Sequence, residues 1–181
     1  MQLIRFDDSN YDKKLAKTFS RNCSPNNKLK AAVEKIIDAV RGEGDESIRL
    51  LTKKFDGVDL NSKDFKLSKK EISSSSKSIS SEVKNAINLS YENVNQFALG
   101  SMRKDWEMRN AQGAIIGESF QPFNSVGIYV PGGTAPLVST ALMTVAIAKA
   151  VNVPKITVCT PPDRSGSVCP ELIYALNRCG A

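Results

Sequence analysis

The residues best suited to bind a ligand lie in one turn, Pro131-Gly132-Gly133. The turn follows the apolar run Val126–Val130 and precedes an expected helix that begins near Ser139. Glycines let the backbone come close to a ligand or to another chain segment, because they carry no Cβ. The free N–H groups at the start of a helix favour an anion. The turn does not match GxGxxG, so by itself it predicts either an anion-binding loop or a tight strand-to-helix connection.

Residues for metal or nucleophilic chemistry are sparse. The chain has no histidine, and its four cysteines form no CxxC pair. A zinc site needs convergent thiolates or imidazoles, so we expect no metal-ligating residues in this chain. We expect reduced, structural cysteines in a cytoplasmic protein, and these are Cys23, Cys159, Cys169 and Cys179.

Composition and charge narrow the class of protein. The 181 residues suffice for one domain with a small helical appendage, and 41% of them are hydrophobic. The net charge is +6, but no basic run is interleaved with aromatic residues, so we expect no nucleic-acid partner. Prolines and glycines interrupt the longest uncharged apolar stretch, Val126–Ile147, and the N-terminus lacks a signal-peptide core. We therefore expect no membrane segment and a cytoplasmic location.

Two helices are predicted before residue 56. Helical spacing over residues 28–41 predicts the first, with Gly42 as its C-cap, and Asp45 can cap the second. The apolar residues on the two inner faces are Leu29, Val33, Ile36, Ile37 and Val40 in the first helix and Ile48, Leu51 and Phe55 in the second.

A third helical region begins at Ser68, which has capping-box spacing to Glu71. The serines at 73–76 compete for backbone groups, so we expect a break or a loose turn there. Beyond them a long helix is predicted up to Gly100, with a buried face of Ile79, Val83, Ala86, Ile87, Tyr91, Val94 and Phe97.

Extended and helical segments alternate after residue 105. Short β-type runs occur at 114–116, 126–130 and 155–160, and helices are expected at 139–151 and 170–178. Asn152 can end the first of these helices in the left-handed conformation. Strand, helix, strand, helix is a βαβα unit, which implies a parallel sheet. The sequence thus predicts an α/β fold, with a helical N-terminal region (1–105) followed by an incomplete Rossmann-like parallel βαβα sheet (106–181).

Three segments carry a resemblance to a known family. VGIYVPGGTAPLVSTALM with AKAVNVPKITVCTPP resembles the glycine-rich segment of histidinol dehydrogenases. Upstream, VEKIIDAVRGEGDESIRLLTKKFDG is similar to the family's N-terminal helices, and CPELIYALNRCGA is similar to its next helix. The resemblance runs from about residue 5 to residue 181. The sequence departs from it at Ile147, where the family usually has proline, and at Asn152, where it usually has glycine.

The resemblance implies a function and a site. Histidinol dehydrogenases oxidise L-histidinol to L-histidine with NAD, use zinc, and act as cytoplasmic homodimers of much longer chains. By resemblance, Tyr129 contacts the dinucleotide, and Pro131, Gly132 and Gly133 support the loop. The zinc ligands and the glutamate-histidine pair of the family would lie beyond residue 181. We therefore expect these residues alone to hold no zinc and to be inactive.

Two other functions remain open at this point. A shortened homologue could act as a non-catalytic module that pairs with a full-length subunit, and another NAD-dependent dehydrogenase could share this part of the chain. An incomplete sheet would also leave a strand edge open, so we expect self-association. In the same way, the helix at 170–178 would lose neighbours and expose Leu172, Ile173 and Leu176.

Overall fold

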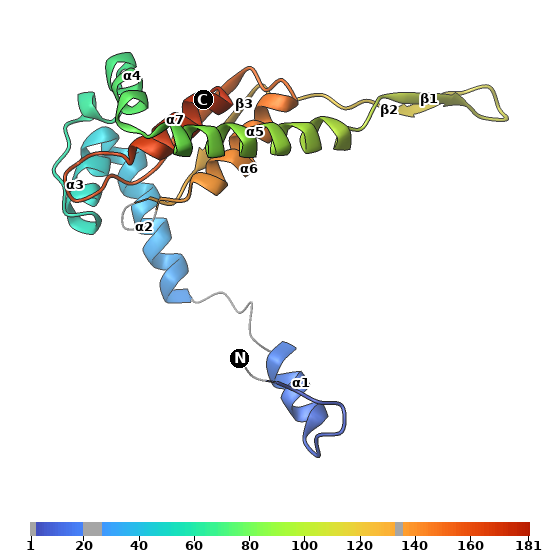
Figure 1. Ribbon diagram of the computed structural model, residues 1–181. Helices are drawn as coiled ribbons and strands as arrows, with labels where there is room; N and C mark the ends of the chain where they lie inside the picture. The colour runs from blue at the N-terminus through green and yellow to red at the C-terminus, as the bar shows by residue number, and fades with distance from the viewer. Residues whose placement is uncertain (1–2, 20–26, 133–135) are drawn as a thin grey trace. The chain divides into compact units, whose positions relative to one another are not determined.

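The structure, a computed structural model, describes residues 3–19, 27–132 and 136–181. By their contacts the residues form two compact units, Met1–Ser47 and Ile48–Ala181. The first part of the chain is helical, and strands occur only from Trp106 onward, as Figure 1 shows. Among the described residues, no helix is both long and apolar enough to cross a membrane. The mixed α/β fold with an incomplete Rossmann-like sheet confirms the expected fold class. The expected division at residue 105 stays a prediction.

The first unit holds α1 (Tyr11–Phe19), α2 (Asn27–Glu43) and the start of α3 (Asp45–Phe55). The structure confirms α2 as a helix, but Gly42 is not its cap, because the helix runs on to Glu43. Gly44 follows at φ 61°, a left-handed conformation that favours glycine and ends the helix there. Neither α1 nor α2 has a buried residue, and the apolar face of α2 is largely exposed.

Helix α3 is present, but Asp45 is its first residue and not the cap before it, and the predicted inner face is partly wrong. Leu51 is half-buried, whereas Phe55 in the last turn is exposed. Gly57, at φ 77°, turns the chain just after the helix ends at Phe55. A 3-10 turn, η1 (Ser62–Asp64), follows before the next helix.

The expected capping box opens α4 (Lys69–Ser78). Ser68 Oγ accepts the N–H of Glu71 at 3.2 Å, and the Glu71 carboxylate accepts the N–H of Ser68 at 2.7 Å. The expected break in the serine run is wrong, because the helix continues through it. The hydroxyls of Ser74 and Ser75 donate to carbonyls within the helix, which satisfies them without interrupting it. The break comes instead at Ile79, which is extended.

The long helix α5 (Ser81–Ser101) confirms the prediction up to Gly100. Its buried face differs from the expected one. Val83 and Ala86 near its start are exposed, and at the C-terminal end Ala98 is buried while Phe97 is 74% exposed. Helical spacing explains the difference at the C-terminal end, because steps of four, three and four from Ile87 through Tyr91 lead to Ala98. Phe97 therefore lies beside that face and not on it.

Strands β1 (Trp106–Arg109) and β2 (Ile115–Glu118) form an antiparallel hairpin. Only the second strand was expected, so the hairpin is a new element. At its tip Asn110 Oδ1 accepts the N–H groups of Gln112 and Ala114. Within the described residues the two strands contact each other and no other helix or strand, and Figure 1 shows them beyond the end of α5.

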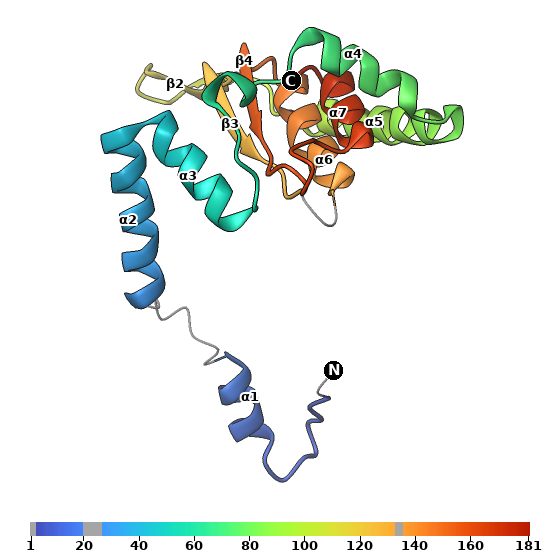
Figure 2. The ribbon, with the colours of Figure 1, turned by 90° about the vertical axis from the view of Figure 1, so that its left-hand side faces the viewer.

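The predicted βαβα unit is present. Strands β3 (Ser125–Tyr129) and β4 (Lys155–Cys159) pair in parallel, from Ser125 opposite Lys155 to Tyr129 opposite Cys159. Helix α6 (Val138–Ala150) connects them, and Asn152 takes the expected left-handed conformation at φ 60°. Figure 2 shows the two strands side by side, with α6 on one side of them. The adjacent helix α7 (Pro170–Cys179) completes the unit.

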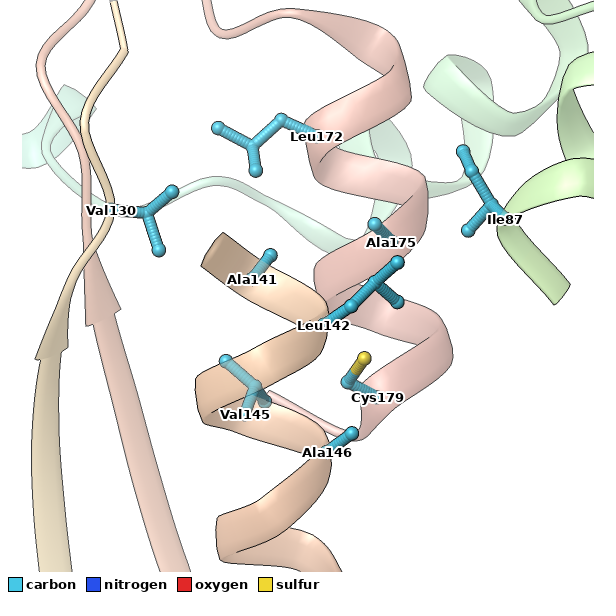
Figure 3. Packing of buried hydrophobic residues seen from close by; sticks show 9 residues of the cluster. All are labelled: Ile87, Val130, Ala141, Leu142, Val145, Ala146, Leu172, Ala175 and Cys179. Carbon is cyan, nitrogen blue, oxygen red and sulfur yellow. The ribbon is translucent and has the colours of Figure 1, made fainter. Parts of the chain in front are cut away.

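The core lies between these strands and the helices. Figure 3 shows Val130 at the end of β3 facing α6 and α7, with Ile87 of α5 on the side away from the strands. The expected exposure of α7 is wrong, because Leu172 and Ile173 are buried and Leu176 is half-buried. Helices α4, α5 and α6 all contact α7 and supply the surface that we expected to be missing.

Candidate functional site

The candidate site lies where β3 and β4 end. Pairing of the two strands persists to Val130, whose N–H donates to the Cys159 carbonyl at 2.9 Å. Val130 is fully buried, so the chain is anchored in the core directly before the Pro131 turn. The Pro131 carbonyl then accepts the N–H of Leu137 at 3.3 Å. Both ends of the glycine-containing turn are therefore tied to the βαβ unit. Gly133 lies outside the described residues.

Tyr129 is the last residue of β3 and is 65% exposed. Side chains alternate along the strand, and Ile128 is partly buried against the core while Tyr129 faces away from it. Its ring is therefore available to a ligand and does not pack in the core of the described chain. Tyr129 lies opposite Cys159 of β4 in the parallel register, and Cys159 is also exposed.

A glycine is required at position 132, because the chain there lies very close to the loop that follows β4. A Cβ added there would lie 2.6 Å from Thr160 Oγ1 and 3.0 Å from the Pro161 carbonyl oxygen. Both distances are shorter than ordinary contacts, so any larger residue would push the two loops apart. The absence of a side chain thus brings the turn after β3 directly against the chain that follows β4.

A small cleft of about 90 Å³ lies between these two loops. Thr160 Oγ1 in its wall is buried and forms no hydrogen bond with the described residues. An unsatisfied buried hydroxyl is unusual and destabilising. The cleft is lined by Gly132, Pro136, Thr160, Pro161, Asp163, Ser167, Val168, Cys169 and Leu172.

Asp163 is the charged group of this cleft. Its Oδ1 accepts the Ser165 hydroxyl at 2.6 Å and the N–H groups of Ser165 and Ser167 at 2.8 and 3.0 Å. The Ser165 hydroxyl, followed by the two N–H groups, lowers the pKa of Asp163, so the side chain is a carboxylate at neutral pH. The sequence reading missed Asp163, although its position after the second parallel strand was a usable signal.

Cys169 also lines the cleft but is poorly suited to act as a nucleophile. Burial, and next the hydrogen bond from its Sγ to Glu171 Oε2 at 2.7 Å, raise the pKa of its thiol. The thiolate, which is the reactive form, is therefore disfavoured at neutral pH.

The start of α6 differs little from the expectation. The helix begins at Val138, one position before Ser139. Leu137 precedes it without a side-chain cap, and its carbonyl accepts the N–H groups of Thr140 and Ala141 at 3.0 and 3.4 Å. The helix start therefore lies next to the turn, as the sequence predicted.

A larger hollow of about 440 Å³ lies on the β1–β2 hairpin. It is shallow, and its polar side chains bond to one another, as when Trp106 Nε1 donates to Glu118 Oε2 at 2.9 Å. It is not continuous with the strand ends, since the hairpin contacts no other described helix or strand. Its size alone does not make it a better candidate than the smaller cleft.

Metal-binding residues do not gather in the described part of the chain, where no three of His, Cys, Asp and Glu come together. Cys159, Cys169 and Cys179 are free thiols, and burial raises the pKa of Cys179 to about 11. Cys23 lies outside the described residues.

Comparisons with known proteins agree on one family. A family model for histidinol dehydrogenase matches residues 19–181. Histidinol dehydrogenase of Symbiobacterium thermophilum is 34% identical over 152 residues, which cover 84% of this chain and 35% of that protein. The chloroplastic enzyme of Arabidopsis thaliana is 37% identical over 150 residues, covering 83% and 31%.

A solved structure shows the same similarity. The crystal structure of histidinol dehydrogenase from Elizabethkingia anophelis matches with a TM-score of 0.79 and 33% identity, and the match covers 84% of this chain and 35% of that one. The chain thus spans about a third of the length of the relatives it matches.

Proposed function

The chain belongs to the histidinol dehydrogenase family, and from this premise we propose that it is the N-terminal part of an enzyme that oxidises L-histidinol to L-histidine with NAD and zinc. Membership places it in an oxidoreductase family of histidine biosynthesis. The substrate, both cofactors and the activity of the whole protein are parts of this proposal.

The dinucleotide part of the proposal is carried by the turn after β3. NAD, when bound, accepts a hydride, and the residues of this chain would bind and orient it. Tyr129 is exposed at the carboxyl end of a parallel strand, where open α/β sheets bind ligands. Gly132 holds the turn close enough to the loop after β4 to form one cleft. We assign Tyr129 as a dinucleotide contact and Pro131, Gly132 and Gly133 as loop supports.

Zinc does not fit residues 1–181. These residues include no histidine, and no cluster of three potential ligands occurs among those that the structure describes. Residues 1–181 by themselves are therefore proposed to bind nucleotide without oxidising histidinol.

Assembly and location are further parts of the proposal. Both β3 and β4 have an outer edge that no other described strand pairs with, and such edges favour pairing with a second chain. This supports a homo-oligomer. A cytoplasmic location is proposed from the sequence, while the Arabidopsis thaliana relative is named as chloroplastic.

A titration of the 181-residue chain with NAD, followed by NMR, tests the nucleotide proposal. We expect weak, saturable binding, roughly millimolar, with shifts centred on Tyr129 and Gly132. The Tyr129→Ala variant should weaken binding. Its matched control is Phe97→Ala, which also removes an exposed aromatic ring, but one that lies on α5 away from the turn in the sequence. Shifts confined to residues 1–60, or equal effects of the two variants, would argue against the assignment.

An activity assay tests the rest of the proposal. Residues 1–181 should form no NADH from histidinol and should retain no stoichiometric zinc by elemental analysis. NADH formation that survives a chelator control would show that the chemistry resides in this part of the chain.

A further inference from the structure

We infer that the cleft between Gly132 and Asp163 binds a ribose of the dinucleotide, and that Asp163 selects a free 2′-hydroxyl over a 2′-phosphate. This inference rests on the proposed function. It adds a sugar subsite and a specificity-determining residue after β4.

The position of Asp163 is the first argument. In sheets that bind dinucleotides, a glycine turn follows one parallel strand, and an acidic side chain after the neighbouring strand accepts the ribose hydroxyls. Here β3 leads into the Gly132 turn, and the adjacent parallel strand β4 leads into the loop with Asp163. Both loops line the same cleft.

The hydrogen bonds of Asp163 are the second argument. All three bonds from Ser165 and Ser167 go to Oδ1. They fix the carboxylate in the loop and leave Oδ2, which takes none of them, as an acceptor. An ionised carboxylate accepts hydrogen bonds and donates none, so it matches a ribose hydroxyl and repels a phosphate.

The unsatisfied hydroxyl of Thr160 is the third argument. Thr160 Oγ1 is buried in the wall of the cleft without a partner among the described residues. A ligand hydroxyl that reached it would supply the missing hydrogen bond. The volume of about 90 Å³ suits a sugar and is well below that of a site enclosing a whole dinucleotide.

Arg164 provides the competing possibility. It is exposed and follows Asp163 directly, and an arginine in such a loop can bind a 2′-phosphate. Asp163 is among the residues that line the cleft and Arg164 is not, which favours the unphosphorylated ribose.

The test compares NAD with NADP in NMR titrations of the 181-residue chain. We expect NAD to bind about tenfold more tightly, because NADP would place a phosphate next to the carboxylate. Asp163→Asn keeps an oxygen for the Ser165 and Ser167 donors but removes the charge. It should bring the two affinities to within about twofold of each other.

Asp105→Asn is the matched control. Asp105 is also a carboxylate held by a serine hydroxyl and a backbone N–H, those of Ser119 and Phe120, but it lies at the hairpin. This variant should leave the preference for NAD unchanged.

Thr160→Val separates ligand binding from a structural role. Removal of an unsatisfied buried hydroxyl should raise the urea midpoint of unfolding, while NAD binding becomes weaker. A purely structural hydroxyl would not change the two quantities in opposite directions.

The outcomes separate the inference from the function on which it rests. Saturable NAD binding with equal or tighter NADP binding, or with no change in Asp163→Asn, overturns the ribose subsite alone. Absence of saturable binding of either nucleotide overturns the proposed nucleotide site and this inference with it.

Discussion

Helices α2 and α6 show that amphipathic spacing and burial are separate properties. Helix α2 has an apolar stripe on a polar background, yet none of its residues is buried. Helix α6 carries one charged residue, Lys149, and has apolar residues all round. Five of its residues are buried: Ala141, Leu142, Val145, Ala146 and Ala150. The spacing of apolar residues predicted both helices. The share of apolar residues in each helix, and not their spacing, indicated how much of the helix is buried.

The largest test of this comparison is Leu172→Ala. Leu172 of α7 is fully buried, with 0% of its surface exposed to solvent. It packs in the hydrophobic cluster that includes the buried residues of α6. Loss of the side chain should lower the free energy of unfolding by about 2–5 kcal/mol. Urea denaturation followed by circular dichroism measures the change.

Leu29→Ala in α2 is the matched control, because Leu29 is 63% exposed. It should change the free energy of unfolding by no more than about 0.5 kcal/mol. Similar losses in the two variants would show that the apolar face of α2 is as well packed in solution as that of α7.

A second test examines where the packed region ends. Gly132→Ala would place a Cβ 2.6 Å from Thr160 Oγ1, and the overpacking should cost about 1–3 kcal/mol. Gly127→Ala in β3 meets open space and is the control. The midpoints of thermal unfolding of the two variants are compared, and that of Gly132→Ala should be lower. Equal midpoints would mean that the contact between the two loops is not tight.

A smaller effect is expected at the start of α4. Ser68→Ala removes the hydroxyl of the capping box and should lower the free energy of unfolding by about 1 kcal/mol. Ser74→Ala removes a hydroxyl that donates to the Glu71 carbonyl within the helix, and it should be close to neutral. A neutral Ser68→Ala would show that α4 contributes little to the packed region, despite its contact with α7.

The smallest effect concerns Cys179, whose pKa is raised to about 11 by burial. In the unfolded chain the thiol titrates near pH 9. Below that pH both states are protonated and the contribution to stability is constant. Between about pH 9 and 11 the unfolded state loses its proton first, so the free energy of unfolding should fall. The Cys179→Ala variant should lack this decline in urea titrations at each pH. A decline of equal size in the variant would assign it to other groups.

Local signals in the sequence predicted most of the fold. The Ser68 capping box, the Asn152 helix end and the parallel pairing of β3 with β4 all depend on short-range chemistry or on a single crossover. The hairpin was missed in part because Trp106–Arg109 is a short alternating run that has no core to face. The burial of Leu172 was missed because it depends on α4 and α5, which lie far away in the sequence.

The candidate site was predictable only in part, for a related reason. The glycine turn and Tyr129 stand next to each other in the sequence and could be recognised together. Asp163 and Thr160 belong to a different loop, and only the parallel register of β3 and β4 brings them to the same cleft. Resemblance to a family indicated the first loop, and the geometry of the sheet was needed for the second.

The single crossover between β3 and β4 also dictates an order of folding. Parallel strands cannot meet through a tight turn, and here the connection includes the whole of α6. Closing this long loop costs entropy before any strand hydrogen bond forms, and a two-stranded sheet recovers little of that cost. Packing of α6 against α5 and α7 supplies the compensating contacts. We therefore expect these three helices to associate in the transition state and the two strands to pair late, so that the cleft for the ligand is among the last features to form.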